Sequence, residues 1–436
     1  MIDTSLREAL ISRRFDGEFI LPSYDDFCLS NVPATIQSFF GLRTGTPTLP
    51  ESYIAKNVAV EDLQNIVLMV FDGLGYSAWL RAISEQGFFQ TVTERGFVLP
   101  ITTVSPSTTA AALTTLATGL TPQEHGLPEW YVYLKELDGI IASLRFSPMG
   151  TRGRDLLVGR VDPKILFSGE TIYTSLSRAD VNSVSLLPSG IWNSAYSSLS
   201  LKGSRVIPYQ SLSEYATMLR KQLSKLEKRT YVYAYYDAID SMAHSYGPNT
   251  DEWQAEVSTV SHVLKHEFLE KLDFETARKT LLIVTADHGH INVNPQDTLY
   301  LNRYRKVFRA FKKSHRGKTI LPSWSPRDMV LYIKENEVDD VQSRLSEILQ
   351  DRAAVLKTKD AVNMGLFGRA APSKRFIERA GDLLLLPHRK DTIWFHHERG
   401  MKFEFLGMHG GLTEDELLIP FAVSKLSNLT SNTTSS

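Results

Sequence analysis

Carboxylate and imidazole side chains recur at the ends of predicted strands, a pattern typical of metal-dependent active sites. Asp72 directly follows the apolar run 65–71, and Asp287 and His288 follow the run 280–285. Because ligands bind beyond the carboxyl ends of strands in open α/β sheets, we expect these side chains to meet at one edge. The residues that could hold metal are Asp72, Asp240, His244, Asp287, His288 and His409.

Six such ligands are enough for two ions of about three ligands each. Mixed aspartate and histidine ligands suit zinc, manganese or iron better than magnesium or calcium, which favour all-oxygen sets. Two ions roughly 3.5–4 Å apart can clamp the attacking and leaving oxygens of a displacement at phosphorus. The predicted chemistry is therefore metal-assisted phosphoryl transfer.

Each of these residues also has a structural interpretation. Asp72 could simply begin a turn. Asp240 and His244, four residues apart on a predicted helix, could be an ordinary pair on one helix face. Four further histidines are interpreted as structural residues or as supports for metal ligands: His125, His290, His396 and His397.

The segment 105–119 raises the question of a nucleophile, because seven of its fifteen residues carry a hydroxyl. Serine and threonine are preferred at helix N-caps, where the side-chain oxygen accepts from a free backbone N–H group. An alanine-rich run that favours helix lies within the segment. Capping therefore explains the segment by itself, and a nucleophile is needed only if metal ligands gather beside it.

The order of the predicted elements indicates an α/β fold with a mainly parallel sheet. Helical segments separate the predicted strands, and such alternation implies right-handed crossovers. We expect strands at 65–71, 97–104, 230–236 and 280–285, and helices at 77–84, 211–226 and 252–272.

The other segments are expected to surround this sheet. Residues 1–63 would form an N-terminal arm, 64–423 the catalytic domain, and 424–436 a flexible tail. Two segments, 127–205 and 302–400, do not follow the strand–helix rhythm and are predicted to be insertions that form a cap.

The composition restricts the class of protein. The 436 residues are 42% hydrophobic and carry a net charge of -1, which argues against stable nucleic-acid binding because that requires a basic face. Cys28 is the only cysteine, so an intrachain disulfide and a cysteine metal cluster are excluded. The sequence has no apolar run of the roughly 20 residues that span a bilayer, and its first residues lack an apolar signal core. We therefore expect a cytoplasmic protein without a membrane partner.

Taken together, these residues resemble the alkaline phosphatase superfamily, and within it the type I phosphodiesterase/nucleotide pyrophosphatase family. The resemblance runs in the family's order from about Asn65 to about Pro420. The matching motifs are Asp72-Gly after a strand, Thr109 before Thr118-Gly119, Glu124-His-Gly126, Asp240-x-x-Ala-His244-x-x-Gly-Pro248, Thr285-Ala-Asp-His-Gly289 and His409-Gly-Gly411. Each motif is modest alone, but the ordered series is specific.

The resemblance implies an alkaline-phosphatase-like three-layer α/β/α core with a smaller inserted cap. It also implies a nucleophile, Thr109, that forms a phospho- or nucleotidyl-threonine which water then hydrolyses. Thr108 is the adjacent alternative. Zinc is the expected metal, with manganese or iron as alternatives. The ligands implied for one ion are Asp240, His244 and His409, and those implied for the other are Asp72, Asp287 and His288, with Thr109 bound beside them.

The implied substrate is a small phosphoester, with a nucleotide as a candidate. A phosphomonoesterase or phosphonate hydrolase on the same site is the alternative, and a catalytically dead metal-binding protein is a third. Ala112 stands where the family's pyrophosphatases carry a phosphate-contacting asparagine, so the preference for diesters is open. Trp130 and Tyr131 are predicted to contact substrate, and Tyr131 or Asn193 could replace the missing amide. The basic stretch 303–313 could steer an anion or be a solvated helix face.

Overall fold

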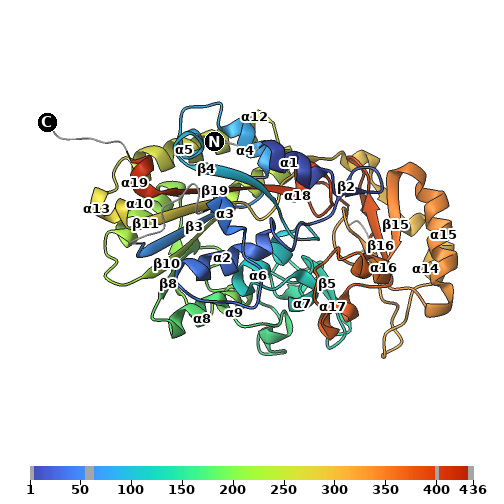
Figure 1. Cartoon of the computed structure of the whole chain (residues 1–436). Coiled ribbons are helices and arrows are strands. Elements are labelled where there is room, and N and C mark those ends of the chain that lie inside the picture. The colour runs from blue at the N-terminus through green and yellow to red at the C-terminus, as the bar shows by residue number, and fades with distance from the viewer. Residues whose placement is uncertain (1–3, 55–62, 398–401, 431–436) are drawn as a thin grey trace.

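A seven-stranded sheet forms the centre of the chain in a computed structural model that describes residues 4–54, 63–397 and 402–430 (Figure 1). Within this sheet only β19 runs against the other strands, so the predicted mainly parallel sheet is confirmed. The strand order is β4 (Phe97–Thr102), β19 (Leu418–Lys425), β11 (Thr280–Thr285), β3 (Asn65–Phe71), β10 (Thr230–Tyr236), β8 (Asn182–Pro188) and β9 (Arg205–Tyr209).

The central strands β3, β10 and β11 have the bounds that the sequence predicts, because they are covered on both faces. Every residue of the three strands is buried. Strands buried in this way are typically continuous apolar runs, which makes them visible in a sequence. Their parallel register pairs Tyr236 with Phe71 and Thr285 with Val70. The carboxyl ends of the three strands therefore lie side by side.

Helices cover both faces of the sheet and complete the three layers that the resemblance implies (Figure 1). One face carries α4 (Tyr76–Ala82), α5 (Phe88–Arg95), α10 (Leu212–Leu223) and α12 (Asp251–Val263). The opposite face carries α2 (Val32–Phe39), α6 (Thr109–Thr118), α8 (Ile172–Arg178) and α9 (Ala195–Ser200). The helix expected at 252–272 continues beyond α12 as a π-helical turn, Leu264–Leu269.

Both ends of the described chain pack against the main core. Helix α1 (Thr4–Ile11) lies against β4, and Cys28 forms a β-bridge with Thr102. Strand β19 extends to Lys425 and is followed by α19 (Leu426–Leu429), whose two leucines are buried. The tail expected to be flexible from residue 424 therefore contributes a strand end and a helix, and its last six residues lie outside the described ranges.

Two three-stranded antiparallel sheets lie outside the main sheet. One contains β5 (Tyr131–Leu134), β6 (Gly139–Ala142) and β7 (Ser147–Pro148); the other contains β14 (Val330–Leu331), β16 (Leu383–Pro387) and β15 (Ala353–Lys357), with α15 (Val338–Leu349) packed on β15. The second sheet stands at one end of the molecule (Figure 1). Strand β8 of the main sheet falls inside the segment 127–205, so a cap insertion there would be confined to the residues before β8. The division into domains remains a prediction.

The remaining helices are short. Across the described ranges, no helix has both the length and the apolar character needed to cross a bilayer. The short helices include α3 (Glu51–Ile54), α7 (Pro122–His125), α13 (Phe274–Arg278), α14 (Arg305–Arg309), α16 (Thr358–Asn363), α17 (Lys374–Arg379) and α18 (Glu414–Leu417).

Candidate active site

The carboxyl ends of three neighbouring strands carry the predicted metal ligands. Asp72 follows β3, Asp287 and His288 follow β11, and Asp240 lies in the first turn of α11 (Ala238–Tyr246), just after β10. His409 follows β18 (Gly407–Met408), which pairs with β12 (Ile291–Asn292) a few residues beyond His288. The ends of three strands and one antiparallel pairing of distant segments therefore bring these residues to one edge of the sheet.

Asp72, Asp287 and His288, called here the Asp72 group, offer three ligand atoms that lie within 4.8 Å of one another. The Nε2 atom of His288 lies 3.3 Å from Asp72 Oδ1 and 3.3 Å from Asp287 Oδ2. Both oxygens are buried and have no hydrogen-bond partner among the described residues. His288 Nδ1 lies 3.1 Å from the Gly289 carbonyl, which directs the Nε2 lone pair toward the two oxygens. Carboxylate oxygens without a hydrogen-bond partner, placed beside an imidazole lone pair, are the kind of ligand atoms that a divalent cation binds.

The electrostatics of Asp72 support this fit. Burial and the nearby carboxylates of Asp287 and Asp240 raise the pKa of Asp72 well above its usual range. The hydroxyl of Tyr235 donates to Asp72 Oδ2 and leaves Oδ1 facing His288. Two buried carboxyl groups beside a third that is partly buried, with too few neighbouring cations, are unfavourable, and a bound divalent ion would remove most of that cost.

A second set, called here the Asp240 group, contains ligand atoms of Asp240, His288, His290 and His409, again within 4.8 Å of one another. His409 Nε2 lies 3.8 Å from Asp240 Oδ1, and its ring stacks on that of His288 at 3.6 Å. Burial and the neighbouring imidazoles hold the pKa of His409 well below its usual range, so its ring is neutral, as a metal ligand requires.

His244 lies at the rim of the Asp240 group. Its Nε2 is 3.5 Å from Asp240 Oδ1, and its Nδ1 is 2.8 Å from the carbonyl of Gly407. Burial alone would raise the pKa of Asp240, but the imidazoles of His244, His290 and His409 outweigh it and hold that pKa well below its usual range. Two of the predicted ligands, His244 and His409, thus lie around the carboxylate of the third, Asp240, and His290 lies there as well.

Thr109 and Thr108 face different environments. Thr109 is the first residue of α6, and its Oγ1 lies 3.0 Å from His288 Nε2. Thr108 is the N-cap: its hydroxyl accepts from the Ala111 N–H and donates to the Pro128 carbonyl at 3.1 Å. The hydroxyl that caps α6 is therefore that of Thr108, and the hydroxyl beside the predicted metal ligands is that of Thr109. Ala112 is fully buried in the main core.

A cavity of about 230 Å³ opens beside Thr109, Asp72 and Asp240. Trp130 lines it, whereas the ring of Tyr131 packs on Trp394 at a centroid distance of 6.2 Å. Neighbouring side chains at the start of a strand point to opposite faces, which explains why only one of the pair reaches the cavity. The rest of the wall is mostly apolar and aromatic, with two cations, Arg145 and Arg154. Asn193 lies 3.4 Å from Arg154 Nη2.

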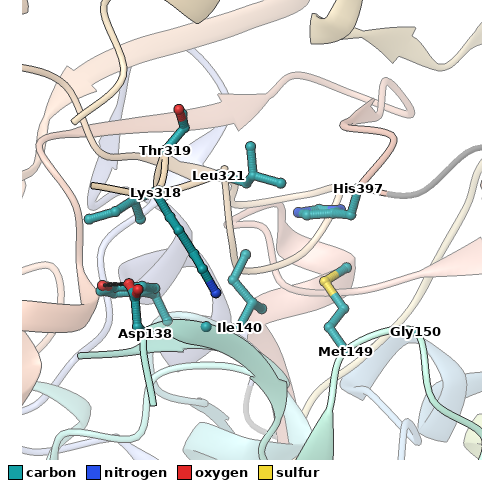
Figure 2. Close-up of a pocket in the computed structure, with 11 residues that line it drawn as sticks. Asp138, Ile140, Met149, Gly150, Lys318, Thr319, Leu321 and His397 are labelled. Atoms are coloured by element: carbon teal, nitrogen blue, oxygen red, sulfur yellow. Dashed lines mark hydrogen bonds between the residues drawn. The ribbon is translucent and has the colours of Figure 1, made fainter. Parts of the chain in front are cut away.

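A cavity of about 210 Å³ lies elsewhere, against the small sheet of β5 to β7 (Figure 2). Asp138, Ile140 and Met149 lie on one side of it, and Lys318 and His397 lie across from them. Its lining contains neither Thr109 nor any of the predicted metal ligands. We therefore assign the chemistry to the cavity beside Thr109.

Of the four histidines interpreted as structural residues or as supports for metal ligands, three lie away from the predicted metal ligands. His125 is buried between the backbone N–H of Leu127 and the hydroxyl of Thr115. His396 stacks on Tyr300, and His397 Nε2 lies 2.7 Å from the Pro322 carbonyl. His290 instead joins the Asp240 group. The signal in the sequence was its place two residues after His288, since alternate residues of an extended segment share a face.

The buried His125 gives a prediction about pH. Burial lowers its pKa to about 3, against 6.5 in an unfolded chain, so the unfolded state binds the extra proton between these values. The contribution of the neutral ring to the free energy of unfolding is therefore lost as pH falls below about 6.5. We expect the stability gap between wild type and His125→Gln to shrink by about 2 kcal/mol between pH 7 and pH 5. Urea unfolding at both pH values measures this gap, and an unchanged gap would refute the assignment.

A buried ion pair supports the loop that carries His409. Arg327 and Glu416 are both fully buried, with Nε to Oε1 and Nη2 to Oε2 each 2.9 Å apart. Glu416 also accepts from the Gly411 N–H at 3.0 Å. On the other side of the loop, Ser107 donates to the Gly411 carbonyl, and its own carbonyl lies 3.0 Å from His409 Nδ1. Neither Arg327 nor Glu416 lies in a sequence motif that predicts this pairing.

Comparisons with known proteins identify the family. The sequence profile of type I phosphodiesterase/nucleotide pyrophosphatase matches residues 66–412. No curated protein sequence matches the chain significantly. Murine ectonucleotide pyrophosphatase/phosphodiesterase 5 is similar in structure, with 17% identity, a TM-score of 0.61, and coverage of 82% of this chain and 88% of that one. Its inactive threonine-to-alanine variant, in complex with AMP, is 16% identical with a TM-score of 0.60. That match covers 82% of this chain and 87% of the other. The human protein is 17% identical with a TM-score of 0.58, and the match covers 83% of this chain and 87% of that one.

These matches correct the expected cytoplasmic location. All three structures are of ecto-enzymes by name, which places the similar proteins outside the cytoplasm. The expectation rested on the lack of an apolar signal core in the first residues and of an apolar run long enough to span a bilayer, and neither is a property of the shared fold. The ordered motifs, the mainly parallel sheet with its ligands at one edge, and the profile match over 66–412 agree. The chain belongs to the type I phosphodiesterase/nucleotide pyrophosphatase family of the alkaline phosphatase superfamily.

Proposed function

We propose that the chain hydrolyses phosphodiester or pyrophosphate bonds with two divalent ions, through a covalent intermediate on Thr109. The observation that carries this proposal is the distance of 3.0 Å from Thr109 Oγ1 to His288 Nε2. That nitrogen also lies 3.3 Å from the unpartnered oxygens of Asp72 and Asp287. A hydroxyl in this position can share a cation with the Asp72 group, which is how a neutral threonine becomes a nucleophile.

Two sets of residues would hold the ions. The Asp72 group and Thr109 would hold one, and Asp240, His244 and His409 would hold the other. Zinc suits these mixed nitrogen and oxygen ligands best, with manganese or iron as alternatives. When bound, the ions lower the pKa of the attacking hydroxyl and offset the negative charge that develops around phosphorus.

The protein itself orients the attacking hydroxyl and the phosphate. Thr109 begins α6, so the free N–H groups and the positive end of this ten-residue helix face an anion bound there. Thr109 Oγ1 gives up its proton and forms the bond to phosphorus, while the leaving oxygen departs with its electron pair and takes up a proton from solvent. Water then attacks the same phosphorus, the bond to Thr109 breaks, and a proton released by that water restores the Thr109 hydroxyl.

The cavity beside Thr109 suits a nucleotide. Its apolar and aromatic wall, with Trp130 at one side, offers a surface on which a base can stack. Arg145 and Arg154 add positive charge for a phosphate beyond the one attacked. One similar structure is described as a complex with AMP, which supports the same class of substrate.

The arginines give a prediction about charge. We expect Arg145→Gln and Arg154→Gln each to raise KM about tenfold for a nucleoside triphosphate, because each removes one charge-assisted contact. KM for bis(p-nitrophenyl) phosphate, which has a single negative charge, should change little. Arg160→Gln is a matched control, since Arg160 is exposed and does not line the cavity. Equal effects on both substrates would contradict this role.

A pair of aryl phosphates tests the proposed reaction against its alternative. We expect zinc-loaded or manganese-loaded protein to hydrolyse bis(p-nitrophenyl) phosphate faster than p-nitrophenyl phosphate, and chelation to abolish both activities. A strong preference for the monoester would favour the phosphomonoesterase alternative. Absence of turnover with either compound, and with nucleotides, would favour a metal-binding protein without activity.

A further inference from the structure

His290 is a buried histidine placed against a predicted metal ligand. Its Nε2 lies 2.7 Å from Asp240 Oδ1, and its side chain is 2% exposed. Its Nδ1 is also buried and has no hydrogen-bond partner in the described part of the chain. The ring therefore has one polar contact, and that contact is the carboxylate of Asp240.

The histidines around it are oriented the opposite way. His244, His288 and His409 each place Nδ1 2.8 to 3.1 Å from a backbone carbonyl. A carbonyl only accepts, so in these rings Nδ1 carries the hydrogen and Nε2 has the lone pair that a metal needs. In His290 it is Nε2 that faces an acceptor, the Asp240 carboxylate. Its hydrogen therefore sits on Nε2, and the buried Nδ1 is left as a lone pair.

The backbone leaves room for this ring. A side chain at Gly73 would place its Cβ 2.8 Å from His290 Cδ2 and 3.1 Å from Asp240 Cα. Gly73 has a φ of +73°, so the glycine is required both for conformation and for space. His290 directly precedes β12, whose pairing with β18 leads to His409. The pairing of β12 with β18 thus positions both the ring of His290 and the predicted metal ligand His409.

We propose that His290 is a positioning residue: its Nε2–H donates to Asp240 Oδ1 and fixes the rotation of that carboxylate for the ion held by Asp240 and His409. The inference rests on the proposed function only in taking Asp240 as a metal ligand. Residues that orient metal ligands in this way typically change metal affinity 10–100-fold when they are removed.

Metal affinity measures this role without any turnover. We expect His290→Leu to weaken one of the two zinc ions about 10–100-fold in competition with a chromophoric chelator. His290→Gln should restore most of that affinity, because its amide N–H can reach the place of Nε2–H. The visible absorption of the cobalt(II)-loaded His290→Gln protein should match wild type, since no ligand has been lost. His396→Gln, on a histidine outside both metal groups, is the control.

Several results would overturn the proposal. If His290→Gln lost the ion as His290→Leu does and its cobalt(II) absorption indicated one nitrogen ligand fewer, His290 would be a ligand itself. If both variants bound two ions as tightly as wild type, it would have no part in metal binding. If wild type bound no ion, the proposed function would fail as well, which separates that outcome from the other two. His290→Gln keeps the test decisive should the leucine variant fail to fold.

Discussion

Replacing Thr109 with alanine is expected to lower kcat for phosphodiester hydrolysis by at least about a thousandfold, because the reaction would lose its proposed nucleophile. Thr109 Oγ1 is 3.0 Å from His288 Nε2 at the floor of the cavity. The substitution removes one hydroxyl and leaves the Thr108 cap in place. Zinc-loaded wild type and variant should be compared on bis(p-nitrophenyl) phosphate, with the metal content of both proteins measured.

Thr108→Ala is the matched control for this experiment. It removes the neighbouring hydroxyl, which caps α6, and should cost about 1 kcal/mol of stability with little change in kcat. Thr109→Ser should keep part of the activity because it keeps a hydroxyl. If Thr109→Ala retained activity and Thr108→Ala lost it, the alternative nucleophile would be correct.

Replacing Arg327 with methionine should lower the free energy of unfolding by about 3–5 kcal/mol. Arg327 and Glu416 are both 0% exposed, and the guanidinium makes two contacts of 2.9 Å to the carboxylate. The variant would leave the charge of Glu416 buried without its partner, which is among the costliest changes in a protein interior. Urea unfolding of metal-free protein measures the loss without a contribution from bound ions.

Two variants show whether the unpaired charge is the cause. Adding Glu416→Leu to Arg327→Met removes both charges and should restore much of the stability. Arg344→Met breaks an exposed pair with Asp340, 3.2 Å apart, and should change stability by less than about 1 kcal/mol. If Arg327→Met were as mild as Arg344→Met, the pair would not support the His409 loop.

The parts of the fold that could be predicted are those with a strong local signal. Strands β3, β10 and β11 are apolar along their length because the sheet buries both faces, so their bounds were predicted correctly. Strand β8 alternates Ser183 and Ser185 with apolar residues and was instead assigned to a cap. Strand β9 gives a different difficulty: this edge strand has only five residues and contains Pro208, so it has no long apolar run that would predict it.

In the site, too, only the residues close to a strong local signal could be predicted from the sequence. Asp72, Asp287 and His288 could be selected because they directly follow strands that the sequence predicts. The contact of His290 with Asp240 joins two segments 50 residues apart, and that of Arg327 with Glu416 joins segments 89 residues apart. Neither pair has a local pattern, because each exists only once the loops beyond the sheet have folded. Trp130 and Tyr131 were predicted together, and the direction of one strand separates them.

The stereochemical course at phosphorus tests the central claim most directly, because it counts the displacements. A nucleotide phosphorothioate ester of known configuration would be hydrolysed by the zinc-loaded protein in water labelled with oxygen-18. Attack by Thr109 followed by attack of water inverts phosphorus twice, so the account predicts overall retention of configuration. Inversion would show that water attacks the substrate directly and would contradict a covalent intermediate on Thr109.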